Sequence, residues 1–332
     1  MTTYIGEFSS DARYNLHPST MSASAATKAT AQPTTQTTSQ AFDEAIDITP
    51  ITSSQLLEGF KDEIRTFSSI ARLQSAVNTL SKRLYQGTTT NQYLVLQPVT
   101  EDNLAKIEEK RHTIGRGLRF TYCTDIDTLI IKVPTPEHER VTKAFSYDFI
   151  RRIENMGLTE LNDLGDMGST AYRGTSTKKE PDACWRPFAI RPNRLDWPTL
   201  VFEVGVSETL SKLRMDARWW LANSQGDVKI VLLFKVNRAA RTIHIEKWEC
   251  RPAALTYATR SNRQPPQVPA QIQTIDINAN GVVTGSPPAT TPPLILHFQN
   301  LLLRQPVPPE QDVIYTAQNL QALANAIWAV LQ

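Results

Sequence analysis

Apolar side chains recur at intervals of three and four residues in the stretch from Ser53 to Tyr85. The positions that set this spacing are Leu56, Leu57, Phe60, Ile64, Phe67, Ile70, Leu73, Val77 and Leu80. Such spacing places them on one face of a helix, and Thr52, Ser53 or Ser54 can cap its start. The pattern predicts an amphipathic helix, broken at most once, whose apolar face packs on the rest of the chain or pairs with a second copy of it.

From residue 118 onward the pattern becomes that of strands alternating with helices. Strands are expected over residues 118–122, 128–133, 171–174, 181–186, 199–204, 228–236 and 241–248. The run VKIVLLFKV (228–236) is the most apolar of them, and the alternating residues 241–248 are expected to be its antiparallel neighbour. Helices are expected within 134–158 and 207–226. This order predicts an α/β core, a mixed sheet of about five strands flanked by helices.

Composition divides the chain into five parts. Residues 1–51 are expected to be a disordered tail, because the Ser, Thr, Ala and Gln of 18–41 offer almost no large apolar side chains to bury. A helical N-terminal extension (52–114) and the core (115–250) follow. Residues 251–294 are expected to be a proline-rich loop with one strand near 271–277, and 295–332 to end in a helix that packs on the core.

Charge, cysteine content and hydropathy exclude several kinds of site and several cellular locations. The 332 residues carry a formal net charge of +2, too mild to indicate a nucleic-acid binder without a local basic patch. The 3 cysteines form no C-x-x-C pair, so a disulfide framework or a structural zinc site is not expected. No stretch has the roughly 18 apolar residues that a membrane helix needs, and the N-terminus lacks the apolar core of a secretory signal. An intracellular protein, cytoplasmic or nuclear, is expected.

Three carboxylates fall at informative places in this order of elements. Glu139 lies in the first turn of the helix that starts near Pro134, Asp182 begins a strand, and Glu203 interrupts the apolar strand TLVFEVG. A charge in a buried strand is costly unless it is paired or binds a metal. Two strand carboxylates with a third from a helix suit Mg²⁺ (or Mn²⁺), a hard cation that stabilises a phosphodiester under attack by water.

The order of these motifs resembles the PD-(D/E)xK superfamily of restriction-endonuclease-like nucleases, and most closely the Uma-type endonucleases. The matching segments are PTPEHERV (134–141), EPDACW (180–185), LVFEVGVSE (200–208) and KLRMDARWW (212–220), followed by the strand VKIVLLF. The resemblance covers about residues 115–250. It implies a restriction-endonuclease-like fold, with Asp182 and Glu203 as catalytic metal ligands and Glu139 as an auxiliary ligand or orienting group.

The chain departs from the superfamily at its lysine, which normally stands two positions after Glu203. Gly205 occupies that place. In the Uma-type proteins the basic residue comes from the next helix, where Arg218 falls at the corresponding position and Lys212 is nearby. An arginine stays protonated, so it can stabilise a phosphate but does not readily transfer a proton. A basic surface beside the site is expected from Lys178, Lys179, Arg186, Lys212, Arg214 and Arg218.

Each of these residues also has a purely structural explanation. Asp182 suits a strand end, Glu203 suits an ion pair with Arg214 or Arg218, and Glu139 favours the helix dipole. His138 is expected to be a helix-start residue rather than a ligand. Trp219 and Trp220 are expected to be one core residue and one half-exposed residue rather than a base-stacking platform.

Three functions therefore compete at the level of the sequence. The leading one is metal-dependent hydrolysis of phosphodiester bonds in DNA or RNA. The alternative, favoured by Gly205, is a catalytically degenerate nuclease fold that binds nucleic acid or protein. In the third, the helix at 53–85 makes the chain a homo-oligomer. No P-loop, dinucleotide-binding or nucleophile-elbow motif is present in the sequence.

Overall fold

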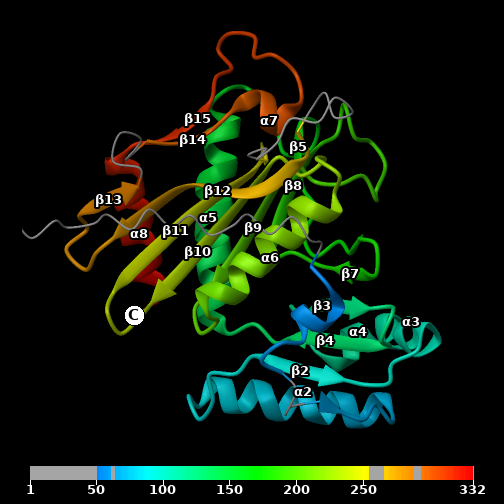
Figure 1. The fold of residues 1–332 in the computed structure, drawn as a ribbon. Helices are drawn as coiled ribbons and strands as arrows, with labels where there is room; N and C mark the ends of the chain where they lie inside the picture. The colour runs from blue at the N-terminus through cyan, green and yellow to red at the C-terminus, as the bar shows by residue number, and fades with distance from the viewer. Residues whose placement is uncertain (1–50, 61–63, 254–264, 287–292, 332) are drawn as a thin grey trace, which may run out of the picture. The chain divides into compact units, whose positions relative to one another are not determined.

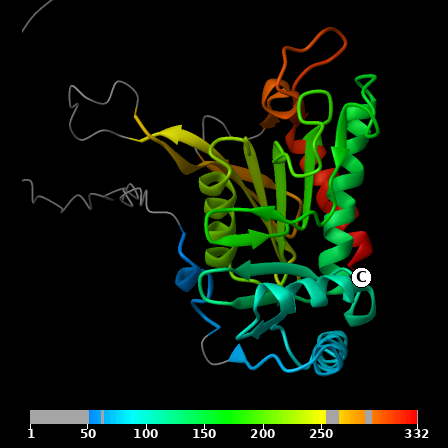
Figure 2. The same cartoon turned by 90° about the vertical axis from the view of Figure 1, so that its right-hand side faces the viewer.

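The strands of the chain form two large sheets rather than one. The computed structural model describes residues 51–60, 64–253, 265–286 and 293–331. In these residues one sheet has six strands, a second has seven, and two further strands form a small ribbon. Helices pack on both large sheets (Figures 1 and 2). The predicted α/β class is confirmed, but the predicted single sheet is not. The expected tail lies outside the described residues except for Ile51.

The six-stranded sheet gathers the first half of the described chain. Its strands, in spatial order, are β1 (Ile64–Arg65), β2 (Tyr93–Leu96), β4 (Thr128–Lys132), β3 (Arg119–Cys123), β7 (Thr177–Lys179) and β6 (Tyr172–Arg173). One face is covered by the helices α2 (Ile70–Tyr85), α3 (Glu101–Glu109) and α4 (Arg111–Ile114). In Figure 1, α2 runs along the outer side of this layer. The residues expected to be a separate helical extension thus contribute β1 and β2 to a sheet.

The helix predicted from Ser53 to Tyr85 is interrupted. Among the described residues of this stretch, 53–60 and 64–85, the helices are α1 (Ser53–Leu56) and α2, and β1 lies between them, paired in parallel with β2. Gly59 adopts φ +90, a left-handed conformation that ends the first segment, and Ser69 caps α2. The apolar residues Leu73, Val77 and Leu80 of α2 are buried against the sheet, so within one chain this face is already covered.

The seven-stranded sheet holds the second half of the chain. Its strands, in spatial order, are β13 (Val283–Ser286), β12 (Gln267–Ile277), β11 (Thr242–Pro252), β10 (Ile230–Asn237), β9 (Leu200–Gly205), β8 (Ala183–Pro187) and β5 (Leu164–Asp166). The predicted antiparallel pairing of β10 with β11 is confirmed. The one strand predicted in the proline-rich region, at 271–277, is present as the longer β12, which pairs antiparallel with both β11 and β13.

Helices cover both faces of this second sheet (Figure 2). On one face α5 (Pro136–Glu154) and α8 (Ala317–Val330) enclose a core that also receives α7 (Phe298–Leu302) and the ribbon of β14 (Leu294–Leu296) and β15 (Val313–Tyr315). The predicted C-terminal helix is therefore present and packs on the core. On the other face lies α6 (Leu210–Asn223).

Helix α6 lies between the two large sheets. Its buried residues Leu213 and Ala217 share one apolar cluster with Val95 and Ile130 of the six-stranded sheet and with Val231 of the seven-stranded sheet. Both tryptophans of α6 are fully buried in this cluster, so the predicted half-exposed one is not found. In the described part of the chain no helix is both long and apolar enough to span a bilayer.

Candidate functional site

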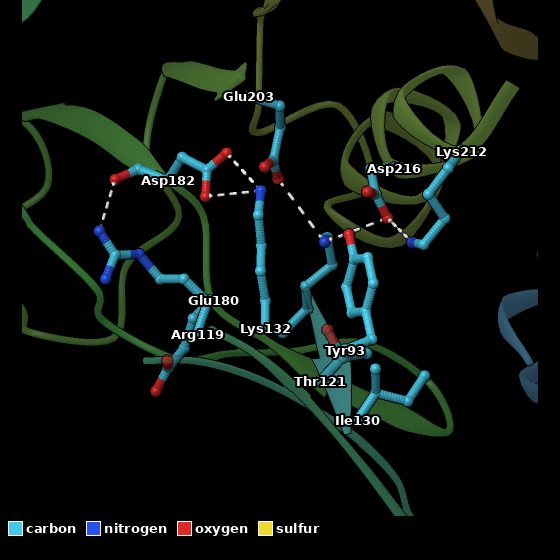
Figure 3. Close-up of a pocket in the computed structure, with 11 residues that line it drawn as sticks. Tyr93, Arg119, Thr121, Ile130, Lys132, Glu180, Asp182, Glu203, Lys212 and Asp216 are labelled. Atoms are coloured by element: carbon cyan, nitrogen blue, oxygen red, sulfur yellow. Dashed lines mark hydrogen bonds and ion pairs between the residues drawn. The ribbon is translucent and has the colours of Figure 1, made fainter. Parts of the chain in front are cut away.

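A small pocket full of charged side chains lies where the start of α6 meets both sheets. Its volume is about 20 Å³, room for little more than one water molecule. The six-stranded sheet contributes Tyr93, Arg119, Thr121, Ile130, Lys132 and Lys179. The other lining residues are Glu180, Asp182, Glu203, Lys212 and Asp216. Figure 3 shows the lysine ammonium groups of this pocket pointing toward the carboxylates of Asp182, Glu203 and Asp216.

Strand register brings the two predicted strand carboxylates to one face. Strands β8 and β9 are antiparallel with Ala183 opposite Phe202, so Asp182, one residue earlier, lies opposite Glu203. Residues opposite each other across antiparallel strands project to the same side of the sheet. Both side chains are almost fully buried, with Asp182 3% and Glu203 2% exposed. The sequence therefore identified two carboxylates that do share one pocket.

Asp182 is held as a carboxylate by three groups. Lys132 Nζ donates to its Oδ1 at 3.1 Å and its Oδ2 at 2.9 Å, and the Val204 backbone N–H donates to Oδ2 at 2.9 Å. His138 Nε2 lies 2.9 Å from the same Oδ2. Burial alone would raise the pKa of Asp182, but the charges of His138 and Lys132 outweigh it and hold that pKa well below its usual value.

Glu203 has the opposite protonation behaviour. The Trp220 indole N–H donates to its Oε1 at 2.6 Å, and Lys179 Nζ is 3.6 Å from the same oxygen. Burial raises the pKa of Glu203 to about 7, and the neighbouring carboxylate of Asp182 adds to the rise while Lys179 opposes it. Glu203 therefore changes its charge near neutral pH, which suits a group that accepts or donates protons.

Lys132 joins the two sheets at this point. It ends β4, yet its Nζ contacts Asp182, lies 2.7 Å from Glu208 Oε1 and donates to the Val204 carbonyl oxygen at 3.3 Å. Burial would lower the pKa of this ammonium, but the charges of Asp182, Glu208 and Glu203 outweigh it, and the pKa is raised. Lys132 therefore stays protonated among these carboxylates.

A second ionic group occupies the α6 side of the pocket. Asp216 Oδ1 accepts a hydrogen bond from Lys212 Nζ at 2.7 Å and lies 3.1 Å from Lys179 Nζ. Burial would raise the pKa of Asp216, but the charges of Lys179 and Lys212 lower it below the usual value. Because Lys212, Asp216 and Trp220 are spaced by four residues, one face of α6 presents Lys212 and Asp216 to the pocket and Trp220 to Glu203.

Two of the other predicted site residues lie differently from the expectation. Glu139 lines no part of the pocket, and its Oε1 is 3.6 Å from Arg119 and 3.8 Å from His138 Nδ1. It therefore borders the group that holds Asp182 rather than joining it. Arg218 does not line the pocket either, because it is two residues from Asp216 and so projects from a different side of α6. Of the two predicted cations of this helix, Lys212 is the one in the pocket.

Several pocket residues were missed at the level of the sequence. Lys132 interrupts the apolar strand TLIIK as Glu203 interrupts its own strand, so the same burial argument applies to both. Asp216 interrupts the buried face of α6 in a similar way. His138 was expected to do no more than start a helix, but it is fully buried against Asp182. Nothing in the local pattern around Lys179 marks it as buried.

Two of the six cations expected to form a basic surface beside the site are buried instead. Lys179 and Arg186 are buried, at 5% and 3% exposure. Arg186 donates to the backbone carbonyl oxygens of Asn193 and Asp196. Arg214 pairs with Glu246, which is fully buried, and not with Glu203. These cations are used inside the fold, because each compensates a buried acceptor.

Comparisons with known proteins identify no family for this chain and a distant structural neighbour. No family model matches the chain, and no curated protein matches it. Among solved structures, the chain is similar to a "putative nuclease belonging to DUF820" from Anabaena variabilis, with 11% sequence identity and a TM-score of 0.38. The similarity covers 68% of this chain and 99% of that chain. A likeness at this level does not extend to individual residues, so the function has to rest on the geometry of the pocket.

Proposed function

We propose that this chain is a metal-dependent nuclease of the PD-(D/E)xK superfamily, of the Uma type, that hydrolyses phosphodiester bonds of DNA or RNA at this pocket. One observation carries the proposal. Asp182 and Glu203 lie opposite each other on adjacent strands, buried in one pocket with three lysine ammonium groups. Burying so many charges costs stability, so their retention is explained best by a chemical role.

The donor set of the pocket suits a hard cation. Asp182 and Glu203 offer carboxylate oxygens. The ammonium of Lys132 already places one positive charge beside Asp182, where a metal ion would place another. The described residues contain no group of three His, Cys, Asp or Glu that could hold a metal. Mg²⁺, however, is commonly held by one or two carboxylates, with waters and substrate phosphate completing its shell. Asp182 and Glu203 would hold Mg²⁺ (or Mn²⁺), which supplies stabilisation of the negative charge on the phosphate.

The side chains of the pocket have separate tasks in this proposal. Glu203 would share the metal with Asp182, and the Trp220 indole N–H that donates to its Oε1 at 2.6 Å holds its carboxylate in place. Lys179 and Lys212 neutralise phosphate oxygens, and His138 holds the Asp182 carboxylate in place.

A lysine from another strand can supply the positive charge that is missing at position 205. A Cβ atom on Gly205 would lie 2.7 Å from Leu213 Cδ1, so a side chain at this position would require Leu213 of α6 to shift. Lys132 delivers an ammonium beside Val204 from the other sheet instead. In this proposal it takes the place of the lysine that the superfamily carries two residues after Glu203.

Cleavage of mixed DNA and RNA substrates in Mg²⁺ or Mn²⁺ tests the function. We expect cutting by the unaltered chain and at least a hundredfold loss in Asp182→Asn and Glu203→Gln, because each removes a group that acts on the reacting phosphate. Glu160→Gln, at an exposed carboxylate, is the matched control. Thermal melting of every variant separates loss of chemistry from loss of the fold. Equal cutting by Asp182→Asn and the unaltered chain would refute the proposal.

A second function is favoured by one specific observation. Each carboxylate of the pocket has a cationic partner, and the cavity holds little more than a water molecule. That arrangement suits a degenerate nuclease fold that binds nucleic acid or protein without cutting. Binding of nucleic acid by the folded chain, with no cutting in either metal, would support this alternative.

A further inference from the structure

A second hollow adjoins the charged pocket and differs from it in character. Its volume is about 260 Å³, and Tyr93 and Lys212 line both spaces. The remaining lining residues are Glu58, Gly59, Phe60, Thr90, Asn91, Gln92, Ser207, Glu208 and Thr209. The hollow is thus lined mainly by aromatic, amide and hydroxyl groups, whereas the charged pocket concentrates the lysines.

The hollow contains a buried polar group without a partner. Gln92 is 1% exposed, and its Nε2 donates to the hydroxyl of Ser207. Its Oε1 has no hydrogen-bond partner among the described residues. A buried acceptor left unpaired costs about 1–3 kcal/mol. A ligand that brings an N–H or O–H donor into the hollow would recover this free energy.

The polar groups of the hollow also select the kind of ligand. Glu58 and Glu208 add carboxylate oxygens, but Glu208 Oε1 lies 2.7 Å from Lys132 Nζ, and Lys212 is engaged by Asp216. With Glu208 and Lys212 paired in this way, the unpaired Oε1 of Gln92 is the group that selects a ligand, and it favours an uncharged group that carries hydrogen-bond donors. Phe60 and Tyr93 pack ring to ring with centroids 4.9 Å apart, and they give this polar hollow an aromatic wall.

We propose that this hollow binds a nucleobase with an exocyclic amino group, next to the phosphate that the charged pocket receives. The inference rests on the proposed nuclease function, which supplies nucleic acid as the substrate class. Aromatic rings stack on bases, and side-chain amides pair with base edges. Because the buried Oε1 of Gln92 is an acceptor without a partner, the amino group of cytosine is preferred to the carbonyl oxygen that replaces it in uracil.

Binding of single nucleotides tests the inference without any cleavage. We measure the affinity of the full chain for cytidine 5′-monophosphate, uridine 5′-monophosphate and ribose 5-phosphate by calorimetry in metal-free buffer. We expect the cytidine nucleotide to bind about tenfold more tightly than the uridine nucleotide, since a well-placed base contact discriminates by roughly 1–3 kcal/mol. Ribose 5-phosphate is expected to bind least tightly, because it lacks the base.

Variants assign the preference to the hollow. Gln92→Met is expected to bring the two nucleotide affinities to within about twofold of each other, and Phe60→Leu to weaken both together. Gln86→Met and Tyr85→Leu, at exposed positions where α2 ends, are the matched controls and should keep the tenfold preference. If Gln92→Met does not fold, Phe60→Leu still tests the aromatic wall.

Two results would overturn this inference. One is equal affinity for all three compounds, and the other is a cytidine preference that persists in Gln92→Met. Neither depends on cutting, so failure of the nuclease assay with a preserved nucleotide preference would reject the catalytic proposal alone. A chain that cuts but shows no base preference would reject base binding in the hollow and leave the catalytic proposal standing.

Discussion

The two carboxylates that face each other across β8 and β9 differ in how firmly they hold a proton. The pKa of Asp182 is lowered by the positive groups of His138 and Lys132, whereas burial raises the pKa of Glu203 to about 7. Neighbouring carboxylates with divergent pKa values are a recurring arrangement in acid–base sites, because one stays charged while the other exchanges protons.

This difference predicts how stability depends on pH. Glu203 has a folded pKa of about 7 against an ordinary value of 4.5, so between these values the folded chain binds the extra proton and the unfolded chain does not. The contribution of Glu203 to stability is therefore greatest below pH 4.5 and is lost as the pH rises to about 7. Glu203→Gln keeps an acceptor for Trp220 and removes the titration. Relative to this variant, the unaltered chain should lose roughly 3 kcal/mol of unfolding free energy between pH 4.5 and 8.

Urea unfolding of both chains at pH 4.5, 6 and 8 measures this change. Glu160→Gln, at an exposed position, should show no comparable trend with pH. A constant difference between Glu203→Gln and the unaltered chain across the range would mean that Glu203 titrates at its ordinary value.

At the scale of elements, α5 and α6 hold β8 and β9 from opposite faces. Helix α5 does so mainly through Phe145, whose ring stacks on Phe202 with centroids 4.2 Å apart and lies 5.9 Å from Trp185 in an edge contact. These rings belong to the strands that carry or flank the two carboxylates. Packing on this face therefore helps to fix the position of the pocket on the other.

A pair of aromatic substitutions on α5 tests this packing. Phe145→Ala removes a fully buried ring and is expected to cost about 3–5 kcal/mol of unfolding free energy. Tyr147 lies on the same helix but is 74% exposed, so Tyr147→Ala should change the unfolding free energy by less than about 0.5 kcal/mol. Denaturant unfolding of both variants measures the contrast. Similar losses in Phe145→Ala and Tyr147→Ala would show that the contacts of Phe145 with Phe202 and Trp185 are not a principal source of stability.

At the scale of the whole molecule, the pocket exists only because two sheets meet at α6. The six-stranded sheet brings Lys132 and Lys179, while the seven-stranded sheet and α6 bring Glu203 and Asp216. The ion pairs that cross this junction link the sheets, so their loss should affect the stability of the fold as well as any chemistry.

Substitution of Lys132 tests the junction. Lys132→Met removes the ammonium from Asp182 and Glu208 and leaves buried negative charge without that partner. We expect a loss of about 3–5 kcal/mol in unfolding free energy, the usual cost of breaking a buried ion pair from one side. Lys143→Met, at an exposed position of α5, should have little effect. A Lys132→Met chain as stable as the unaltered one would show that the ion pairs contribute no net stability across the junction.

Much of the secondary structure was predictable from the sequence. Periodicity identified the helices α5, α6 and α8 and the strands β8, β9 and β10, because each of them buries one face or both and the pattern records that burial. It overestimated the helix between 53 and 85, where Gly59 and the pairing of β1 with β2 override the apolar spacing. It also missed the start of β12, residues 267–270, which include a proline and gain their order from pairing with β11.

The sequence by itself determined that Asp182 and Glu203 belong together, since a charge in a buried strand demands a partner and the order of the strands places both on neighbours. Only the tertiary structure decided what those partners are. Lys132 is 50 positions from Asp182 in the sequence and comes from the other sheet, so no local pattern connects them. Residue type and spacing record the cost of burying a charge, but the group that offsets that cost is set by how distant segments pack.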